Sequence, residues 1–289
     1  MKAVGVMYRR LPRFLPVFFL AFLLGFWAAA SAPVSAKDQK VTADYSINFN
    51  GIGIGDFKIT SDMNDNQYTI KARARISVLA GMLFEWRGDT SSTGQVMARR
   101  PHPFSYSFGY RTGDKGENID VKFSNNVVEE IAVSPPQRQN PSRIPITRKH
   151  MLNVVDPLSA VVMLTNIGSN KSGTEVCSRR LPIFDGKQRY DIKLSYKGTK
   201  AVSAAGGYNG PAFVCKVKFL PIAGHKPGDK ENEYAAKSES MEMWMIPLSK
   251  AELYVPYYVY IPTSVGGASL TATGFSVEGN ADHRRALVR

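Results

Sequence analysis

Hydrophobic and polar residues alternate with a period of two along most of the chain after residue 44. The alternation is clear in the segments 45–49, 57–59, 68–76, 104–110, 119–123 and 190–196. In the last of these, Tyr190, Ile192, Leu194 and Tyr196 are separated by single polar residues. This period is typical of strands that turn one face to a core and the other to water. The pattern therefore predicts a mainly β protein.

Short turn sequences separate the predicted strands. They are Asn64-Asp65-Asn66, Gly113-Asp114-Lys115-Gly116, Ser124-Asn125-Asn126 and Asp185-Gly186. Connections this short join antiparallel neighbours, because parallel strands need a long crossover. Many antiparallel strands without helices between them indicate a curled sheet, a barrel-like meander or a sandwich. We predict an antiparallel curled sheet or barrel-like meander with one short helix.

The short helix is predicted at residues 156–164. Asp156 is a good N-cap, and Pro157 suits the first helical position. We expect this helix to plug one end of a barrel or to pack on an open sheet edge. Surface loops are predicted at 134–149, which contains four prolines, and at 223–233.

A glycine-rich segment lies early in the chain. Gly51, Gly53 and Gly55 alternate with two isoleucines and superficially resemble a phosphate-binding loop. Such a loop must be followed by a helix, whereas the strand pattern resumes at once. We therefore interpret the segment as a hairpin or a sharp bend.

The N-terminal 36 residues have the three parts of a secretory signal peptide. Three arginines precede an apolar run from Val17 to Ala30, and the segment ends in Val34-Ser35-Ala36. The alternative is an uncleaved membrane anchor, but the run is shorter than the roughly 20 residues that span a bilayer. We predict cleavage after Ala36, a periplasmic location and a single all-β domain over residues 37–289, without a transmembrane segment.

The chain is basic, with a formal net charge of +13. The predicted signal peptide carries four basic residues and no acidic one, so the exported chain keeps a charge of 13 − 4 = +9. This excess favours contact with anionic envelope surfaces or acidic partners, or serves solubility alone. We expect no nucleic-acid partner, because an exported protein would rarely meet one.

Cys177 and Cys215 are the two cysteines of the chain, and both lie beyond the signal peptide. An even pair in an exported protein predicts one disulfide bond, with two separate buried thiols as the alternative. No Cys-x-x-Cys motif is present, which argues against redox catalysis.

The sequence has no recognised catalytic or metal-binding motif. None of the four histidines is spaced as a zinc ligand, and there is no Gly-x-Ser-x-Gly. Glu129 and Glu130 would point to opposite faces of a strand, which is wrong for a glycosidase pair. We predict no catalytic residue, no metal and no cofactor. A catalytic site built from dispersed residues remains open, because such residues can be far apart in the chain.

Aromatic residues near glycine or proline are the candidates for ligand contacts. We choose Trp86, Trp244, Tyr257 and Tyr258, which are large and amphipathic. Pro256 indicates an edge strand or a bulge beside the two tyrosines. The neighbouring segment 241–245 places three methionines on one face, which predicts core packing rather than a Cu(I) site.

Several segments resemble the Domain of Unknown Function 3108 family. They are Tyr45-Ser46-Ile47 with Gly51 to Gly55, Leu83-Phe84-Glu85-Trp86 with Ser92-Thr93-Gly94, Asp156 to Ala160, Phe184 to Tyr190, Met243-Trp244-Met245 and Pro262-Thr263. The resemblance covers residues 43–277. It implies an exported bacterial envelope protein with a mostly β fold, and it implies no catalytic residues.

These observations predict a non-catalytic periplasmic protein. It would bind a lipid, glycan or protein of the cell envelope, or act as a scaffold for envelope integrity. A curled sheet with an aromatic inner face can hold an amphipathic ligand. The alternative is a periplasmic enzyme with a dispersed active site. The sequence leaves the oligomeric state open.

Overall fold

The computed structural model describes residues 39–279, except 79–80, 82–83, 137–139, 167, 169 and 205–207. The predicted signal peptide, residues 1–36, and its cleavage site lie outside the described residues.

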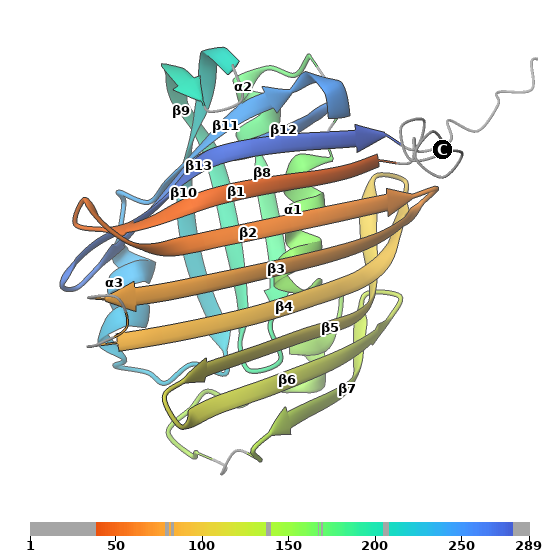
Figure 1. Cartoon of the computed structure of the whole chain (residues 1–289). Helices are drawn as coiled ribbons and strands as arrows, with labels where there is room; N and C mark the ends of the chain where they lie inside the picture. The colour runs from red at the N-terminus through yellow and green to blue at the C-terminus, as the bar shows by residue number, and fades with distance from the viewer. Residues whose placement is uncertain are drawn as a thin grey trace, which may run out of the picture. The chain divides into compact units, whose positions relative to one another are not determined.

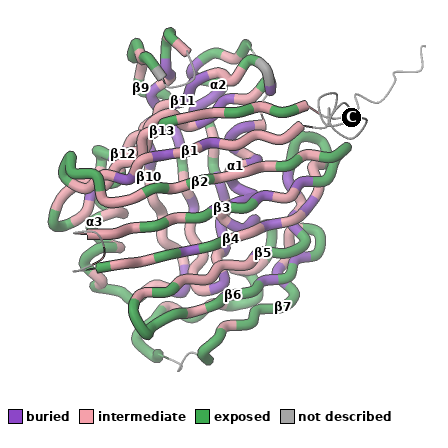
Figure 2. The backbone as a smooth tube through the Cα atoms, in the orientation of Figure 1, coloured by how far each residue is buried: buried purple, intermediate pink, exposed green. Residues whose placement is uncertain are grey.

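Thirteen strands form one antiparallel sheet in the described part of the chain (Figure 1). They are β1 (Gln39–Phe49), β2 (Ile52–Asn64), β3 (Gln67–Val78), β4 (Phe84–Met97), β5 (Arg100–Thr112), β6 (Lys115–Ser124), β7 (Val127–Ser134), β8 (Arg179–Phe184), β9 (Arg189–Ala204), β10 (Tyr208–Ala223), β11 (Glu242–Leu248), β12 (Leu253–Thr263) and β13 (Gly266–Gly279). All four predicted turns lie between strands. Burial alternates along the strands as the period-two pattern predicts, most regularly in β3 and β6 (Figure 2).

The strand order is β7-β6-β5-β4-β3-β2-β1-β13-β12-β11-β10-β9-β8. The chain therefore builds two meanders, which join where β1 pairs with β13. The sheet is not closed, and its edges are β7 and β8. The predicted fold class, a mainly β protein with a curled antiparallel sheet, is confirmed.

The segment 152–155 connects the two edges of the sheet. Leu152 forms a bridge with Val127 of β7, and Val155 forms a parallel bridge with Ile183 of β8. The Val155 amide donates to the Pro182 carbonyl at 2.9 Å, and the Phe184 amide donates to the Val155 carbonyl at 2.9 Å. Backbone groups of both edges are thus partly satisfied by this segment, which protects them from pairing with other chains.

Helix α1 (Pro157–Thr165) lies in the interior of the curled sheet. Leu158 and Val162 belong to a buried cluster with residues of β3, β5 and β6, whereas Ala160 and Leu164 pack with residues of β8 to β11. We call the sheet face that turns to α1 the inner face and the opposite one the outer face. The predicted helix is therefore present. It lies inside the curl and not at the end of a barrel, and it packs on the edge strand β8 as well as on β4, β5 and β12. Because α1 is apolar on opposite sides, both halves of the sheet can bury it.

Two further α-helices and two 3₁₀ turns were not predicted. They are α2 (Gly173–Cys177), α3 (Lys230–Lys237), η1 (Arg148–Met151) and η2 (Ser249–Ala251). The predicted loop 223–233 thus contains the start of α3, where the Asp229 side chain accepts from the Asn232 amide. Their short length leaves no hydrophobic period that a sequence pattern could reveal.

The predicted disulfide bond joins Cys177 of α2 to Cys215 of β10. Both cysteines are fully buried in the cluster that also contains Met241 and Met245. The bond therefore attaches the connection between β7 and β8 to the second meander. The two methionines pack in the core, as predicted.

Two backbone irregularities agree with the sequence. Asn50 and Gly51, both with positive φ, form the tight β1–β2 turn that the glycine-rich segment predicts. The β11–β12 register shifts between Trp244 and Met245, opposite Tyr257. Pro256 therefore lies at a bulge, the second of the two predicted alternatives, and not on an edge strand.

Candidate functional site

A buried polar network fixes the start of α1. Asp156 Oδ1 accepts from the amides of Leu158 and Ser159, both at 2.9 Å. Asp156 Oδ2 accepts from Ser92 Oγ at 3.0 Å and from Ser159 Oγ, and Tyr68 hydrogen-bonds Ser159 at 2.6 Å. Burial raises the pKa of Asp156, although the hydrogen bonds from Ser159 and Ser92 oppose this effect. Asp156 and Ser159 have no exposed surface, so the network positions α1 and cannot itself bind a ligand.

The β8–β9 turn meets the first meander beside α1. Asp185 Oδ1 accepts from the amides of Lys187 at 2.8 Å and of Gln188 at 2.7 Å, which shapes the turn. Lys187 Nζ then reaches β6 and donates to both carboxylate oxygens of Glu117, at 2.8 and 2.9 Å. This largely buried ion pair joins residues 70 positions apart in the chain.

Gly186 is required by this turn for two reasons. Its φ is +92°, and a Cβ atom there would lie 2.4 Å from Cγ2 of Ile119. We expect Gly186→Ala to lower the free energy of unfolding by about 3 kcal/mol, since left-handed strain costs about 1–2 kcal/mol and overpacking against Ile119 costs about 1–3 kcal/mol. Urea unfolding measures this. Gly113→Ala is the control, because its φ is also positive but its Cβ would meet nothing within 4 Å. Equal losses in the two variants would contradict the contact with β6.

An aromatic pocket of about 420 Å³ opens on the inner face where this turn, β4 to β6 and α1 meet. We call it the inner pocket. Trp86 stacks on Tyr110, with ring centroids 6.1 Å apart and planes inclined by 19°. Phe108 lies beside Tyr110 at 6.1 Å, and Tyr106 and Tyr190 also line the pocket. Flat aromatic faces of this kind provide a large apolar contact area with few lost rotamers.

Charged side chains lie at the same pocket. Glu117, Lys187, Asp185 and Arg143 line it, and Arg143 is held by a hydrogen bond from Nη1 to the Gly224 carbonyl at 2.7 Å. Burial raises the pKa of Asp185, opposed by the amides of Lys187 and Gln188. Burial also raises the pKa values of Tyr106 and Tyr190. An aromatic pocket with a few polar groups and shifted pKa values is the usual form of a binding site.

The apolar surface continues from the inner pocket along β3 and β4. Ile76 lies opposite Trp86 in the register, and Val78 lies opposite Phe84. Phe84 is on the same face as Trp86 because the two are separated by two positions. It is 43% exposed. An apolar track thus leads from the pocket toward the β3–β4 turn.

The structure places the four residues that were predicted to contact a ligand in two separate regions. Trp86 lines the inner pocket, whereas Trp244, Tyr257 and Tyr258 lie together on β11 and β12. The rings of Trp244 and Tyr258 are 4.7 Å apart, and Lys200 Nζ lies 4.3 Å from the Trp244 ring centroid. Tyr257 packs in the same hydrophobic cluster as Trp244 and Phe275. None of these three lines the inner pocket, so their predicted role in binding stays a prediction.

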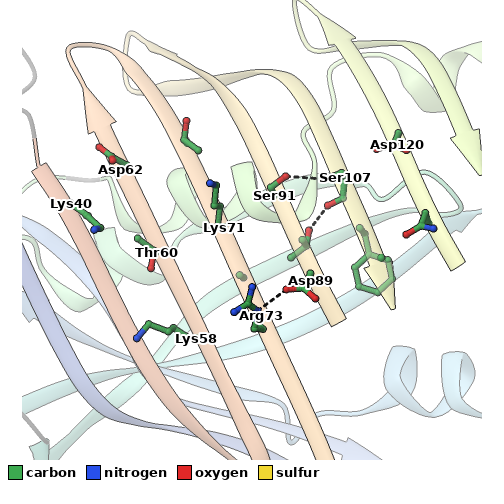
Figure 3. A pocket seen from close by; sticks show the side chains of 16 residues that line it. Lys40, Lys58, Thr60, Asp62, Lys71, Arg73, Asp89, Ser91, Ser107 and Asp120 are labelled. Atoms are coloured by element: carbon green, nitrogen blue, oxygen red, sulfur yellow. Dashed lines mark hydrogen bonds and ion pairs between the residues drawn. The ribbon is translucent and has the colours of Figure 1, made fainter. Parts of the chain in front are cut away.

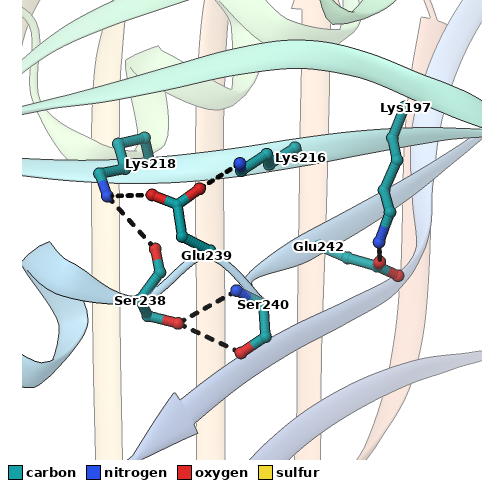
Figure 4. Close-up of polar contacts among 7 residues, drawn as sticks. All are labelled: Lys197, Lys216, Lys218, Ser238, Glu239, Ser240 and Glu242. Atoms are coloured by element: carbon teal, nitrogen blue, oxygen red, sulfur yellow. Dashed lines mark hydrogen bonds and ion pairs between the residues drawn. The ribbon is translucent and has the colours of Figure 1, made fainter.

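Hydrogen bonds and ion pairs connect the residues around Trp244. Its indole Nε1 donates to Glu242 at 3.0 Å, and Glu242 pairs with Lys197 (Figure 4). In the same figure Glu239 lies between Lys216 and Lys218 of β10. Hydrogen bonds from these lysines lower the pKa of Glu239 to about 2. The connection from α3 to β11 is therefore attached to β10 by charge.

Sequence reasoning missed most of the inner pocket. Tyr106, Phe108 and Tyr110 were recognised only as one face of a strand. Asp185, Gly186 and Lys187 were recognised as a turn. The sequence did contain a signal for the pocket. Three aromatic residues on one face of a single strand form a large amphipathic surface, which is suited to ligand contact. In the part of the chain that the structure describes, no group of three or more His, Cys, Asp or Glu residues is arranged to hold a metal ion.

These features define a class of protein, an open curled antiparallel sheet with a buried helix and an aromatic inner pocket. The family model described as "Protein of unknown function (DUF3108)" matches residues 44–273. The chain therefore belongs to this family, and the predicted resemblance is confirmed. No curated protein matches the chain.

A similar solved structure is a β-barrel-like protein of Domain of Unknown Function DUF1849 from Brucella abortus. The match has a TM-score of 0.46 and 11% sequence identity, and it covers 84% of this chain and 99% of that one. Within the described residues, no helix is long and apolar enough to cross a membrane.

Proposed function

We propose that this protein is an exported, non-catalytic protein of the cell envelope that binds an amphipathic lipid in the inner pocket. The observation that carries the proposal is the division of the pocket into an aromatic wall and a set of charged groups. An acyl chain would lie along the apolar track of Trp86, Ile76 and Phe84, and a polar head would face Arg143 and Lys187. Burial of each methylene group contributes about 0.8 kcal/mol.

Binding is favoured over catalysis by the state of the carboxylates. Asp185 Oδ1 already accepts two backbone hydrogen bonds, and Glu117 is paired with Lys187. Breaking a buried ion pair to obtain a base would be costly. The periplasmic location is proposed from the predicted signal peptide, and the positive charge of the remaining chain suits an anionic envelope.

A periplasmic enzyme is the second candidate, and the raised pKa of Asp185 is the observation that favours it. In that case Asp185 would act as a general acid. Incubating the protein with an envelope lipid extract separates the two functions. Unchanged lipid masses support binding, whereas product masses that disappear in Asp185→Asn would establish the enzyme.

The first experiment is native mass spectrometry of protein purified from a periplasmic extract, together with lipid extraction of the same sample. A bound lipid mass would support the proposal and name the lipid class. A protein without bound lipid, which also fails to bind added phospholipid, would contradict it.

Trp86→Ala tests the aromatic wall. We expect the affinity for dansyl-undecanoic acid to fall about tenfold or more, since a truncated aromatic contact commonly costs more than 1 kcal/mol. Dansyl emission measures binding. Trp244→Ala is the matched control, because Trp244 does not line the inner pocket.

The control variant should bind within about twofold of the wild type. Trp244→Phe also makes Trp86 the sole tryptophan after removal of the signal peptide, because the third one is Trp27. In that variant, energy transfer from Trp86 to the dansyl group reports directly on the pocket. Equal loss of binding in Trp86→Ala and Trp244→Ala would contradict the assignment.

A further inference from the structure

The outer face of β1 to β6 carries a second hollow, with a volume of about 880 Å³ (Figure 3). We call it the outer hollow. Its floor consists of the short residues Ser91, Ser107 and Gly109 on β4 and β5. Longer residues rise on the two sides, with Lys71 on β3 and Asp120 on β6. The hollow therefore results from short side chains between longer ones, and the sheet beneath it is continuous.

Hydroxyl groups follow one row of the outer hollow. In the register, Lys71 lies between Thr60 of β2 and Ser91 of β4, and Ser91 lies opposite Ser107 of β5. The hydroxyls of Ser91 and Ser107 are 2.8 Å apart. Asp120 follows Ser107 in the same row. The row thus presents an ammonium group, hydroxyls and a carboxylate along one line.

Most cations of the hollow are already paired. Arg73 lies 2.7 Å from Asp89, Lys58 lies 3.2 Å from Asp44, and Lys40 lies 3.9 Å from Glu278.

Three charges of the hollow have no such partner. Among the residues that the structure describes, Lys71, Asp62 and Asp120 form no ion pair. The hollow therefore offers one free ammonium donor and two free carboxylate acceptors, in addition to its hydroxyl groups.

We propose that the outer hollow binds a segment of a neutral oligosaccharide. A sugar hydroxyl both donates and accepts, so it can satisfy carboxylate, ammonium and hydroxyl groups alike. The four cations and three carboxylates of the lining nearly cancel, so the hollow lacks the cationic excess that would hold a polyanion. An apolar ligand would leave these charges unsatisfied. The volume lies within the range of about 300–1,000 Å³ that is usual for small-ligand sites. The site is independent of the inner pocket, because it is on the opposite face of the sheet.

The test is a ¹⁵N NMR titration with chitotetraose and maltotetraose, with sodium polyphosphate as the anionic comparison. We expect shifts at β3 to β6 with at least one of the two saccharides. Ser107→Gln fills the floor and Lys71→Gln removes the ammonium donor. Each should weaken saccharide binding about tenfold, because hydrogen bonds to charged groups are strong and a filled floor excludes the ligand.

Each variant has a matched control. Ser105→Gln makes the same change on the same strand, outside the hollow, where Ser105 pairs with Thr93. Lys193→Gln removes the same charge on β9. Both should bind within about twofold of the wild type. The proposal is overturned if neither saccharide binds, if polyphosphate binds at the same residues more tightly, or if the controls lose binding equally.

Discussion

Replacement of Cys177 and Cys215 together by alanine is expected to lower the free energy of unfolding by about 4 kcal/mol. The bond closes a loop with a sequence separation of 38 residues. In the chain-entropy model, a loop of this length gives that value through its restriction of the unfolded chain. The effect is large compared with the total stability of a domain, which is about 5–15 kcal/mol.

Urea unfolding of the two proteins, monitored by tryptophan fluorescence, measures this difference. Wild-type protein unfolded with a reductant is the control, and it should match the variant within about 1 kcal/mol. A loss below about 1 kcal/mol in both samples would contradict the proposed contribution. Because the bond holds α2 to β10, we also expect the variant to lose order first at α2.

Asp156→Ala is expected to lower the free energy of unfolding by about 3–4 kcal/mol. The substitution removes the acceptor for the amides of Leu158 and Ser159 and for the hydroxyl of Ser92, all within the buried interior. Loss of an N-cap costs about 1–2 kcal/mol, and each buried donor left without an acceptor costs about 1–3 kcal/mol. Urea unfolding at neutral pH measures the change.

Asp156→Asn is the matched variant, because an amide oxygen can still cap α1. Burial raises the pKa of Asp156 in the folded protein above its unfolded value of about 3.9. Between these two values the folded state binds more protons, so the contribution of Asp156 to stability falls as the pH rises. The asparagine variant carries no such group. Its stability relative to wild type should therefore increase from pH 4 to pH 7.

Unfolding curves at pH 4, 5.5 and 7 give this comparison. The effect of Asp185, whose pKa is also raised, is present in both proteins and cancels in the difference. A wild type that gains stability relative to Asp156→Asn as the pH rises would show that the hydrogen bonds outweigh burial.

The two proposed binding sites lie on opposite faces of the sheet and differ in the chemistry of their side chains. The inner pocket combines the Trp86–Tyr110 stack with the Lys187–Glu117 pair. The floor of the outer hollow consists of the short residues Ser91, Ser107 and Gly109. One sheet can carry both because side chains alternate between its faces. Variants of Trp86 and of Lys71 should therefore affect separate ligands.

Local features were predictable from the sequence by itself. The period of two defined the strands, because each strand needs an apolar and a solvated face. Asp156 and Pro157 defined the start of α1, since capping depends on residues within one turn. The glycine-rich segment that begins at Gly51 and the pair Asp185-Gly186 predicted turns, because glycine readily adopts the positive φ that Gly51 and Gly186 have in the structure. The pair Cys177–Cys215 was predictable because no other cysteine exists in the chain.

Only the tertiary structure decided which of these features meet. Ser92 contacts Asp156 across 64 positions, and Lys187 contacts Glu117 across 70. An alternating pattern predicts which side chains of a strand share one face of the sheet. It does not predict how far the sheet curls or which strands form its edges. Curvature arises from strand twist and from bulges such as the one at Tyr257, and these effects add over the thirteen strands that the structure describes. For this reason the sequence predicted Trp86 and Trp244 as equal candidates, and the curl of the sheet placed only Trp86 at the inner pocket.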